Sequence, residues 1–218
     1  MEKIDFKKLN KELYQQKEQP SLVQVPAIPF VAVEGCGDPN TTNGEYQQAI
    51  GLLYGISYAI KMSHRNKVEL EGWCDFTVPP LEGLWSMEGM QGMDYQHKEK
   101  LQWIAMLRLP AFVTPEIFAW AKQAYLQKHS EAAVDKASYW LYEEGLCAQI
   151  LHKGSFDEEP ATLKRLHAFL EEQGYQLDFT EGPYMRTNTR CHHELYLSNP
   201  QRTKPEQYKT IIRVPVKR

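Results

Sequence analysis

Four consecutive residues, Cys191–Glu194, carry a thiol, two imidazoles and a carboxylate, all of which can bind zinc. The stretch "CHHELYLS", however, has the alternation of a β-strand, whose successive side chains point to opposite faces. His192 and Glu194 would therefore share one face. Because Cys191 and His193 would point the other way, the four groups cannot converge on one tetrahedral ion. We expect no metal and no other cofactor here.

The carboxylate of Glu194 is the group in this strand that most needs an explanation. Leu195 and Leu197 continue the face that begins at Cys191, which predicts that this face packs under a helix. Glu194 and Tyr196 would then face a crevice, where an unpaired carboxylate costs several kcal/mol. Either a nearby Lys or Arg, or solvent, compensates the charge, or the carboxylate attracts a cationic ligand or takes a proton from water.

The balance of charges argues against nucleic acid as a partner. The 218 residues include 25 Lys and Arg and 28 Asp and Glu, with a formal net charge of −3. These charges are interspersed along the chain, whereas nucleic-acid binding normally needs a concentrated basic surface. We therefore expect no nucleic-acid binding.

The N-terminal sequence and the apolar runs bear on where the protein acts. The first twenty residues are charged and lack the apolar core of a signal peptide, and no later run approaches the about 18 apolar residues of a membrane span. We expect a cytoplasmic protein that does not associate with membranes. The cysteines form no CxxC pair, which argues against a disulfide framework: Cys36, Cys74, Cys147 and Cys191.

The elements that would position the candidate residues follow the same order twice. Residues 1–20 are expected to form a polar helical extension, and a helix near 114–128 is expected to join the two halves. The first half is predicted to contain strands at about 26–34, 68–77 and 81–87, a helix that begins near Thr42 or Asn43, and an apolar stretch at 103–109. The second half is predicted to contain strands at about 146–152, 176–180 and 191–198, and a helix at 160–172.

This shared order predicts an α+β fold that repeats one strand–helix–strand–strand module. The modules would span about 21–112 and 138–218, and the tripeptide DFT recurs in them, at Asp75–Thr77 and Asp178–Thr180. Pseudo-symmetric modules of this kind form antiparallel sheets with helices on one side. A crevice between them would suit a small ligand, because pockets favour such interfaces.

Other glutamates have less specific contexts. Glu82 lies near the start of the last strand of the first half, as Glu194 does in the second. It would either line the other half of the crevice or simply end a strand. Glu143 and Glu144 are expected in a solvated turn.

Two long stretches carry a resemblance to a known family. "EGLCAQILHKGSFDEEPATLKRLHAFLEEQGYQ" and "HHELYLSNPQRTKPEQYKTIIRVPV" resemble the GyrI-like small-molecule-binding family, in the free-standing branch without a DNA-binding domain. The similarity extends over roughly residues 20–215. It implies a tandem of two small α+β modules around a pseudo-dyad. Family members that sense aromatic or cationic drugs have a pocket glutamate at the position that matches Glu194.

The same resemblance implies a reaction, because some free-standing members hydrolyse the strained cyclopropane of DNA-alkylating natural products. Opening such a ring needs a carboxylate to deprotonate water and a donor for the carbonyl oxygen. Glu194 would be the base, and Tyr54 or Tyr142 the donor. Core packing is the alternative for each aromatic side chain among the expected ligand-binding residues, which are Trp85, Trp103, Phe156, Tyr184, Tyr196, Glu82 and His192.

Three classes of function stay open from the sequence. The first is a binding protein for aromatic, cationic or cyclopropane-bearing compounds that also hydrolyses them. The second is a drug-binding or sensing module without catalysis. The third is a gyrase-inhibitor-type domain that docks a protein segment, whose identity the sequence does not give.

Overall fold

The computed structural model of the chain describes residues 3–87, 97–180, 189–200 and 202–218. Its strands are β1 (Ser21–Cys36), β2 (Glu82–Met87), β3 (Leu101–Arg108), β4 (Ser138–Lys153), β5 (Gln176–Leu177), β6 (His192–Tyr196) and β7 (Lys209–Lys217). Its α-helices are α1 (Phe6–Leu9), α2 (Lys11–Tyr14), α3 (Glu45–Lys61), α4 (Pro115–Leu126) and α5 (Glu159–Gln173). Short 3-10 helices are η1 (His64–Asn66), η2 (Lys98–Lys100), η3 (Val134–Lys136), η4 (Phe156–Glu158) and η5 (Pro205–Gln207).

Within the described ranges, six strands pair antiparallel in a closed ring. The order is β4–β1–β3–β2–β6–β7, and the pairing of β7 with β4 closes it, while the short β5 adds to β7. The element orders β1–α3–β2–β3 and β4–α5–β6–β7 repeat one pattern. This repeat confirms the predicted α+β fold. Modules at about 21–112 and 138–218, joined through α4, remain our interpretation of the domain organisation.

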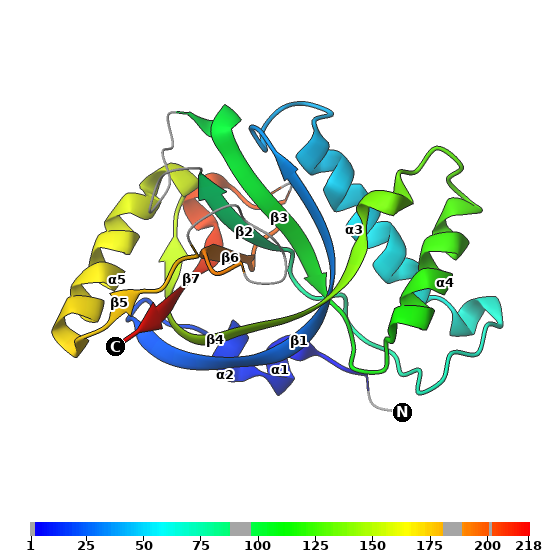
Figure 1. Cartoon of the computed structure of the whole chain (residues 1–218), viewed down its shortest axis with the longest axis horizontal. Helices are drawn as coiled ribbons and strands as arrows, with labels where there is room; N and C mark the ends of the chain where they lie inside the picture. Colours follow the sequence, from blue (N-terminus) through cyan, green and yellow to red (C-terminus); the bar gives the residue numbers. More distant parts are fainter. Residues whose placement is uncertain (1–2, 88–96, 181–188, 201) are drawn as a thin grey trace.

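The long helices cover the outer face of the ring. In Figure 1, α5 lies on one side of the closed sheet, and α3 with α4 lies on the other. Leu166 and Leu170 of α5 pack against Ile150 of β4 and Ile212 of β7, while α3 packs on β1 and β3. Among the described residues, no helix combines the length and apolar character needed to cross a membrane.

The strands β1 and β4 are longer than the sequence predicts. Each spans 16 residues instead of the expected 26–34 and 146–152. The two strands pair with each other from Ser21 opposite Gln149 to Ala32 opposite Ser138. Backbone hydrogen bonds between the two strands also include the flanking segments. The side-chain pattern of those segments is too polar or irregular to predict a strand.

Residues 68–77 do not form the predicted strand. Phe76 makes only an isolated parallel bridge to Ile4. The ammonium group of Lys61 donates to Asp75 Oδ1, at 2.5 Å, and to the carbonyl oxygen of Phe76. These contacts hold the segment as a loop against the end of α3. Its aromatic residue Phe76 is buried in the core without being part of the sheet.

The first twenty residues contribute side chains to the body of the protein. Phe6, Leu13 and Tyr14 of α1 and α2 are buried. The guanidinium carbon of Arg108 lies 4.4 Å from the centre of the Phe6 ring, in a cation–π contact. Leu13 and Tyr14 reach the interior of the closed sheet.

Candidate functional site

The strand β6 separates the four candidate metal ligands into two pairs, as its alternation predicts. Glu194 lies opposite Gly83 of β2, and His193 lies opposite Leu84. His193 lines the cavity inside the ring. Because side chains alternate along a strand, His192 and Glu194 point to the outer face.

We predicted that the face with Cys191 and Leu195 packs under a helix and that Glu194 faces a crevice. This prediction was wrong. Glu194 pairs with Ile212 of β7, which packs against α5, so Glu194 lies on the helix-bearing side of the sheet. Leu195 instead faces the enclosed interior. In a closed ring both faces are buried, so leucines do not mark the side that carries the helix.

On the outer face, Glu159, His192 and Glu194 form a compact group that we call the Glu194 cluster. His192 Nε2 lies 3.1 Å from Glu194 Oε1, and all three side chains are buried. One ligand atom from each residue lies within 4.8 Å of the others. One imidazole and two carboxylates could hold a divalent ion, bind an organic cation or transfer a proton. This donor set differs from the four consecutive residues that the sequence suggested.

Aromatic rings from several elements lie beside the Glu194 cluster. Trp85 Nε1 of β2 donates to Tyr196 Oη at 2.8 Å. The Tyr46 ring of α3 has its centre 5.2 Å from that of Trp85 and 5.0 Å from that of Trp103. Phe156 of η4 meets Tyr196 edge-on at 5.9 Å. Four of the expected ligand-binding aromatic residues thus form one connected group.

The phenols of Tyr46 and Tyr196 stay protonated in this environment. Burial raises the pKa of Tyr46 above its usual value, and the nearby Glu194 charge adds to the effect. Burial and then the same charge raise the pKa of Tyr196 well above its usual value. Both groups can therefore donate hydrogen bonds at neutral pH.

The structure does not bring all the expected site residues to Glu194. Tyr142 lies inside the ring, where its hydroxyl donates to the carbonyl oxygen of Thr189 at 3.0 Å. Glu82 also points inward. Tyr54 lies two turns along α3 from Tyr46 and is half-buried, with its pKa raised by burial. Tyr184 lies outside the described residues.

Two members of the site were missed from the sequence. Tyr46 starts a row of core-facing residues at helical spacing in α3, a pattern that indicates packing and does not single out its hydroxyl. Glu159 begins α5 in the sequence "DEEPATL", where acidic residues usually cap a helix at the surface. Its full burial depends on β6, which lies more than thirty residues later, so no local pattern could have revealed it.

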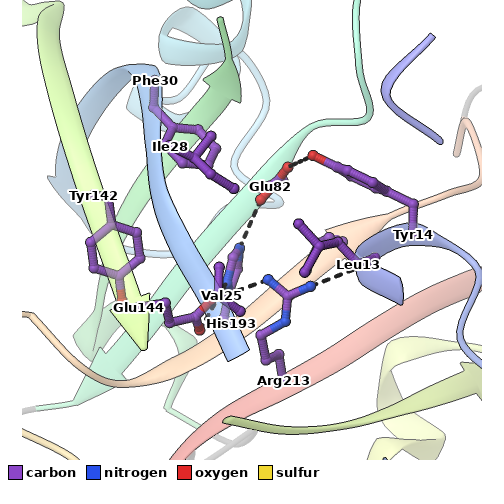
Figure 2. Close-up of a pocket in the computed structure, with 11 residues that line it drawn as sticks. Leu13, Tyr14, Val25, Ile28, Phe30, Glu82, Tyr142, Glu144, His193 and Arg213 are labelled. Carbon is purple, nitrogen blue, oxygen red and sulfur yellow. Dashed lines mark hydrogen bonds and ion pairs between the residues drawn. The ribbon is translucent and has the colours of Figure 1, made fainter. Parts of the chain in front are cut away.

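Inside the ring, a second set of charged residues forms what we call the interior cluster: Glu82, Glu144, His193 and Arg213. Figure 2 shows these side chains pointing toward one another. His193 Nε2 lies 3.2 Å from Glu82 Oε2, and its Nδ1 lies 3.0 Å from Glu144 Oε2. Arg213 Nη1 lies 3.1 Å from the same Glu144 oxygen. The expectation that Glu144 lies in a solvated turn was therefore wrong.

The N-terminal helices complete the interior cluster. Arg213 Nη2 donates to the carbonyl oxygen of Leu13, and Tyr14 Oη donates to Glu82 Oε1 at 3.0 Å (Figure 2). The cavity between these residues has a volume of about 10 Å³, the space of one water molecule. The interior therefore has no room for an organic ligand, and its charges serve the fold.

Folding stability is expected to depend on pH through two residues of the interior cluster. Burial opposes ionisation of Glu144, but the charges of His193 and Arg213 outweigh it and lower its pKa from 4.5 to about 2. Its contribution is therefore present above about pH 4.5 and lost as the pH falls toward 2. Burial disfavours the charged form of His193, but Glu144 and Glu82 raise its pKa above 6.5. That contribution is lost as the pH rises through the raised value.

Urea unfolding at several pH values checks this expectation. The free energy of unfolding should be highest between about pH 4.5 and 6.5. His193→Gln should flatten the decline on the alkaline side while it lowers overall stability. An alkaline limb that is equally steep in wild type and His193→Gln would assign the decline to other groups.

Tyr14→Phe is expected to destabilise the fold by about 1–3 kcal/mol, because Glu82 loses a buried donor. Tyr58→Phe on α3 is the matched control, since that side chain is 49% exposed. Guanidinium unfolding should show no more than about 0.5 kcal/mol for the control. Equal stabilities for the two variants would mean that the Tyr14 hydroxyl contributes nothing.

A family model and several solved structures match nearly the whole chain. Residues 18–217 match the GyrI-like small molecule binding domain. An uncharacterized conserved protein from Listeria innocua is 41% identical over 99% of this chain and 100% of its own, with a TM-score of 0.90. A hydrolase from Listeria innocua is 39% identical over the same shares, with a TM-score of 0.88. No match was found among curated proteins.

A more distant structure shares the fold alone. The EcmrR C-terminal domain is 12% identical over 92% of this chain and 98% of its own, with a TM-score of 0.54. The family match covers both strand–helix–strand–strand repeats and the strand that carries Glu194. It also agrees with the resemblance over about 20–215. The chain belongs to the family of GyrI-like small-molecule-binding domains.

Proposed function

We propose that the chain binds flat aromatic or cationic small molecules at the Glu194 cluster and hydrolyses those that carry an electrophilic cyclopropane. The observation that carries this proposal is the buried carboxylate of Glu194, 3.1 Å from His192 and flanked by aromatic rings. Such a compound would be detoxified by the addition of water. We expect this to occur in the cytoplasm, where alkylating agents reach DNA.

The carboxylates explain the preference for cationic ligands. Glu194 and Glu159 are at most 4% exposed, and two buried carboxylates close together attract a positive charge. A ligand cation would respond to these charges, and flat rings can stack on the neighbouring Trp85 and Tyr196. The aromatic residues therefore orient the ligand while the carboxylates select its charge.

The proposed reaction adds one water molecule across a strained carbon–carbon bond. Glu194 takes a proton from water, and the water oxygen bonds to the less substituted cyclopropane carbon. The electron pair of the broken bond moves into the conjugated dienone, which becomes a phenol when its oxygen takes up a proton. His192 would hold the Glu194 carboxylate in place through their 3.1 Å contact.

In this scheme, the proton for the dienone oxygen comes from a tyrosine on the outer face of the ring. Tyr46 and Tyr196 lie beside the Glu194 cluster and stay protonated, and Tyr54 lies further along the same helix as Tyr46. Tyr142 faces the interior and already donates to Thr189, so we no longer propose it as the donor. The similarity to the hydrolase from Listeria innocua, 39% identical over nearly the whole chain, supports the proposal that this chain is an enzyme.

The decisive experiment is incubation of the protein with a cyclopropane-bearing alkylator in ¹⁸O-labelled water, followed by mass spectrometry. Multiple turnovers to a ring-opened product that carries the label support the hydrolase proposal. A ligand-dependent rise in melting temperature without product would instead show a binding or sensing module. Co-purification of gyrase without either effect would indicate a protein-interaction domain.

A further inference from the structure

The three residues of the Glu194 cluster come from two packed elements of the fold. His192 and Glu194 are two positions apart in β6, so their side chains extend from the same face of the sheet. Glu159 begins α5, which packs on the same outer side of the ring. All three side chains are at most 5% exposed. The cluster is therefore enclosed by the fold and is not an acidic patch on the surface.

The donor atoms of the Glu194 cluster suit one divalent transition-metal ion. One donor atom from each residue lies within 4.8 Å of the other two, and His192 Nε2 is 3.1 Å from Glu194 Oε1. Zinc binds imidazole nitrogen and carboxylate oxygen at about 2.0–2.2 Å, so the ligands of one ion lie roughly 3–4 Å apart. Small side-chain rotations would bring all three donors onto one ion. Sites with three protein ligands keep a fourth position for water.

A buried hydroxyl beside the Glu194 cluster is available to such a water molecule. Tyr46 is 9% exposed, and its hydroxyl has no hydrogen-bond partner in the described part of the chain. Burial raises the pKa of Tyr46 and the charge of Glu194 adds to the effect, so this hydroxyl lies near the carboxylate. Leaving a buried hydroxyl without a partner is costly. A water molecule on the ion would supply the partner that Tyr46 lacks.

The sheet leaves room for polar groups at this point. Gly83 lies opposite Glu194, and a Cβ there would come within 2.8 Å of Trp85 Nε1 and 3.0 Å of Tyr196 Oη. The glycine thus lets the indole nitrogen and the phenol oxygen occupy the space next to Glu194. Conserving that space for polar atoms is consistent with a bound ion and its water, which need hydrogen-bonding groups around the ligands.

We propose that Glu159, His192 and Glu194 bind a divalent transition-metal ion, with a water molecule in the fourth position that hydrogen-bonds to Tyr46. The imidazole nitrogen favours Zn²⁺ over Mg²⁺ and Ca²⁺, which prefer oxygen ligands alone. The sequence led us to expect no metal, because four consecutive residues cannot converge on one ion. The proposed set takes only His192 and Glu194 from those four and adds Glu159 from another element.

The bound ion would compete with the organic cations that we propose as ligands. A Glu194 carboxylate that coordinates a metal cannot take a proton from water, so the ion would also inhibit ring opening. This consequence rests on the proposed function, whereas metal binding itself does not. The experiments therefore measure binding without any turnover, and failure of the hydrolase proposal would leave their outcome unchanged.

The first experiment adds Mn²⁺ to ¹⁵N-labelled wild-type protein, because the unpaired electrons of Mn²⁺ broaden the NMR signals of nearby groups. Trp85 Nε1 donates to Tyr196 beside the Glu194 cluster. Trp73 Nε1 donates to Ile60, fourteen residues further along α3 than Tyr46, which is about 21 Å at 1.5 Å per residue.

We expect the indole signal of Trp85 to broaden well before that of Trp73. Trp85→Phe and Trp73→Phe identify the two signals. One equivalent of Zn²⁺ should restore the Trp85 signal, because Zn²⁺ binds nitrogen and oxygen ligands more tightly than Mn²⁺. Equal broadening of both indole signals, or no broadening of Trp85, would overturn the proposal.

The second experiment removes one ligand at a time and measures Zn²⁺ binding by calorimetry. His192→Gln and Glu159→Gln each delete a ligand, and His167→Gln is the matched control, since His167 is exposed on the same helix as Glu159. The affinity of the tightest Zn²⁺ site should fall about tenfold or more in the two ligand variants and stay within about twofold in the control. Dispersed indole signals check that each variant is folded. Equal affinities in all three variants would refute the assignment of the ligands.

Discussion

Glu194→Gln is expected to lower kcat/KM for cyclopropane opening by about 10²–10⁴-fold, the usual contribution of a general base. Glutamine keeps the size and planarity of the side chain but cannot take a proton from water. It can also still accept the contact from His192, so the loss reports proton transfer and not a collapsed site. Steady-state hydrolysis of a cyclopropane-bearing alkylator measures the effect.

Glu143→Gln is the matched control for this substitution. The same chemical change is made on an exposed residue of β4, away from the helix-bearing outer face of β6. Its kcat/KM should remain within about twofold of wild type. Turnover in Glu194→Gln equal to that of the control would remove Glu194 as the base and leave the aromatic residues to account for binding.

The stability of Glu194→Gln gives a second signature. A buried carboxylate that serves function usually lowers stability, so its neutral replacement should unfold at the same temperature as wild type or higher. A large loss of stability would instead assign Glu194 a structural role. Activity and stability measured on the same preparation therefore distinguish a catalytic carboxylate from one that holds the fold.

The sequence predicted the element order well, because hydrophobic periodicity is a local property. One strand followed by one helix was readable in each half without any tertiary contact. The two strands after each helix are β2 with β3 and β6 with β7, whereas the prediction used 68–77 with 81–87 and 176–180 with 191–198. The errors occur where contacts between segments far apart in the sequence determine the structure. Residues 68–77 look like a strand, but Lys61 holds Asp75 and Phe76 in a loop. The closure of the sheet through β4 and β7 has no local signal at all.

The candidate site was predictable in part for the same reason. Alternation in β6 correctly separated His192 and Glu194 from Cys191 and His193. It could not say which face carries the helix, so Glu82 remained a candidate for the other half of the crevice, whereas its side chain faces the interior. Residues that join the site from other elements, such as Glu159, depend on packing across the fold.

The interior cluster shows why buried charges are hard to find in a sequence. Glu144 sits in "YEEG", which reads as a solvated turn, and Arg213 lies near a basic C-terminus. Their contact joins residues 69 positions apart. Only the closed ring, which places β4 beside β7, makes the two charges neighbours and excludes water from them.

Arg213→Met is therefore expected to destabilise the fold by about 3–5 kcal/mol, because it leaves buried carboxylates without their strongest cation. Arg213 is 2% exposed and donates to Glu144, to Gln149 and to the carbonyl oxygen of Leu13. Methionine fills a similar apolar volume, so the loss reports charge and hydrogen bonding. The melting temperature should fall by roughly 6–20 °C for a chain of this size.

A double-mutant cycle shows whether the charge of Glu144 causes that loss. In Arg213→Met with Glu144→Gln, no unpaired carboxylate remains at Glu144, so the combined cost should be about 0.5–3 kcal/mol less than the sum of the single costs. Lys136→Met is the control for an exposed pair, since Lys136 and Glu45 are both about half exposed, and it should cost less than about 1 kcal/mol. Strict additivity in the cycle would mean that Arg213 stabilises the fold through Leu13 and Gln149 alone, and that the closed sheet tolerates Glu144 with His193 as its only partner.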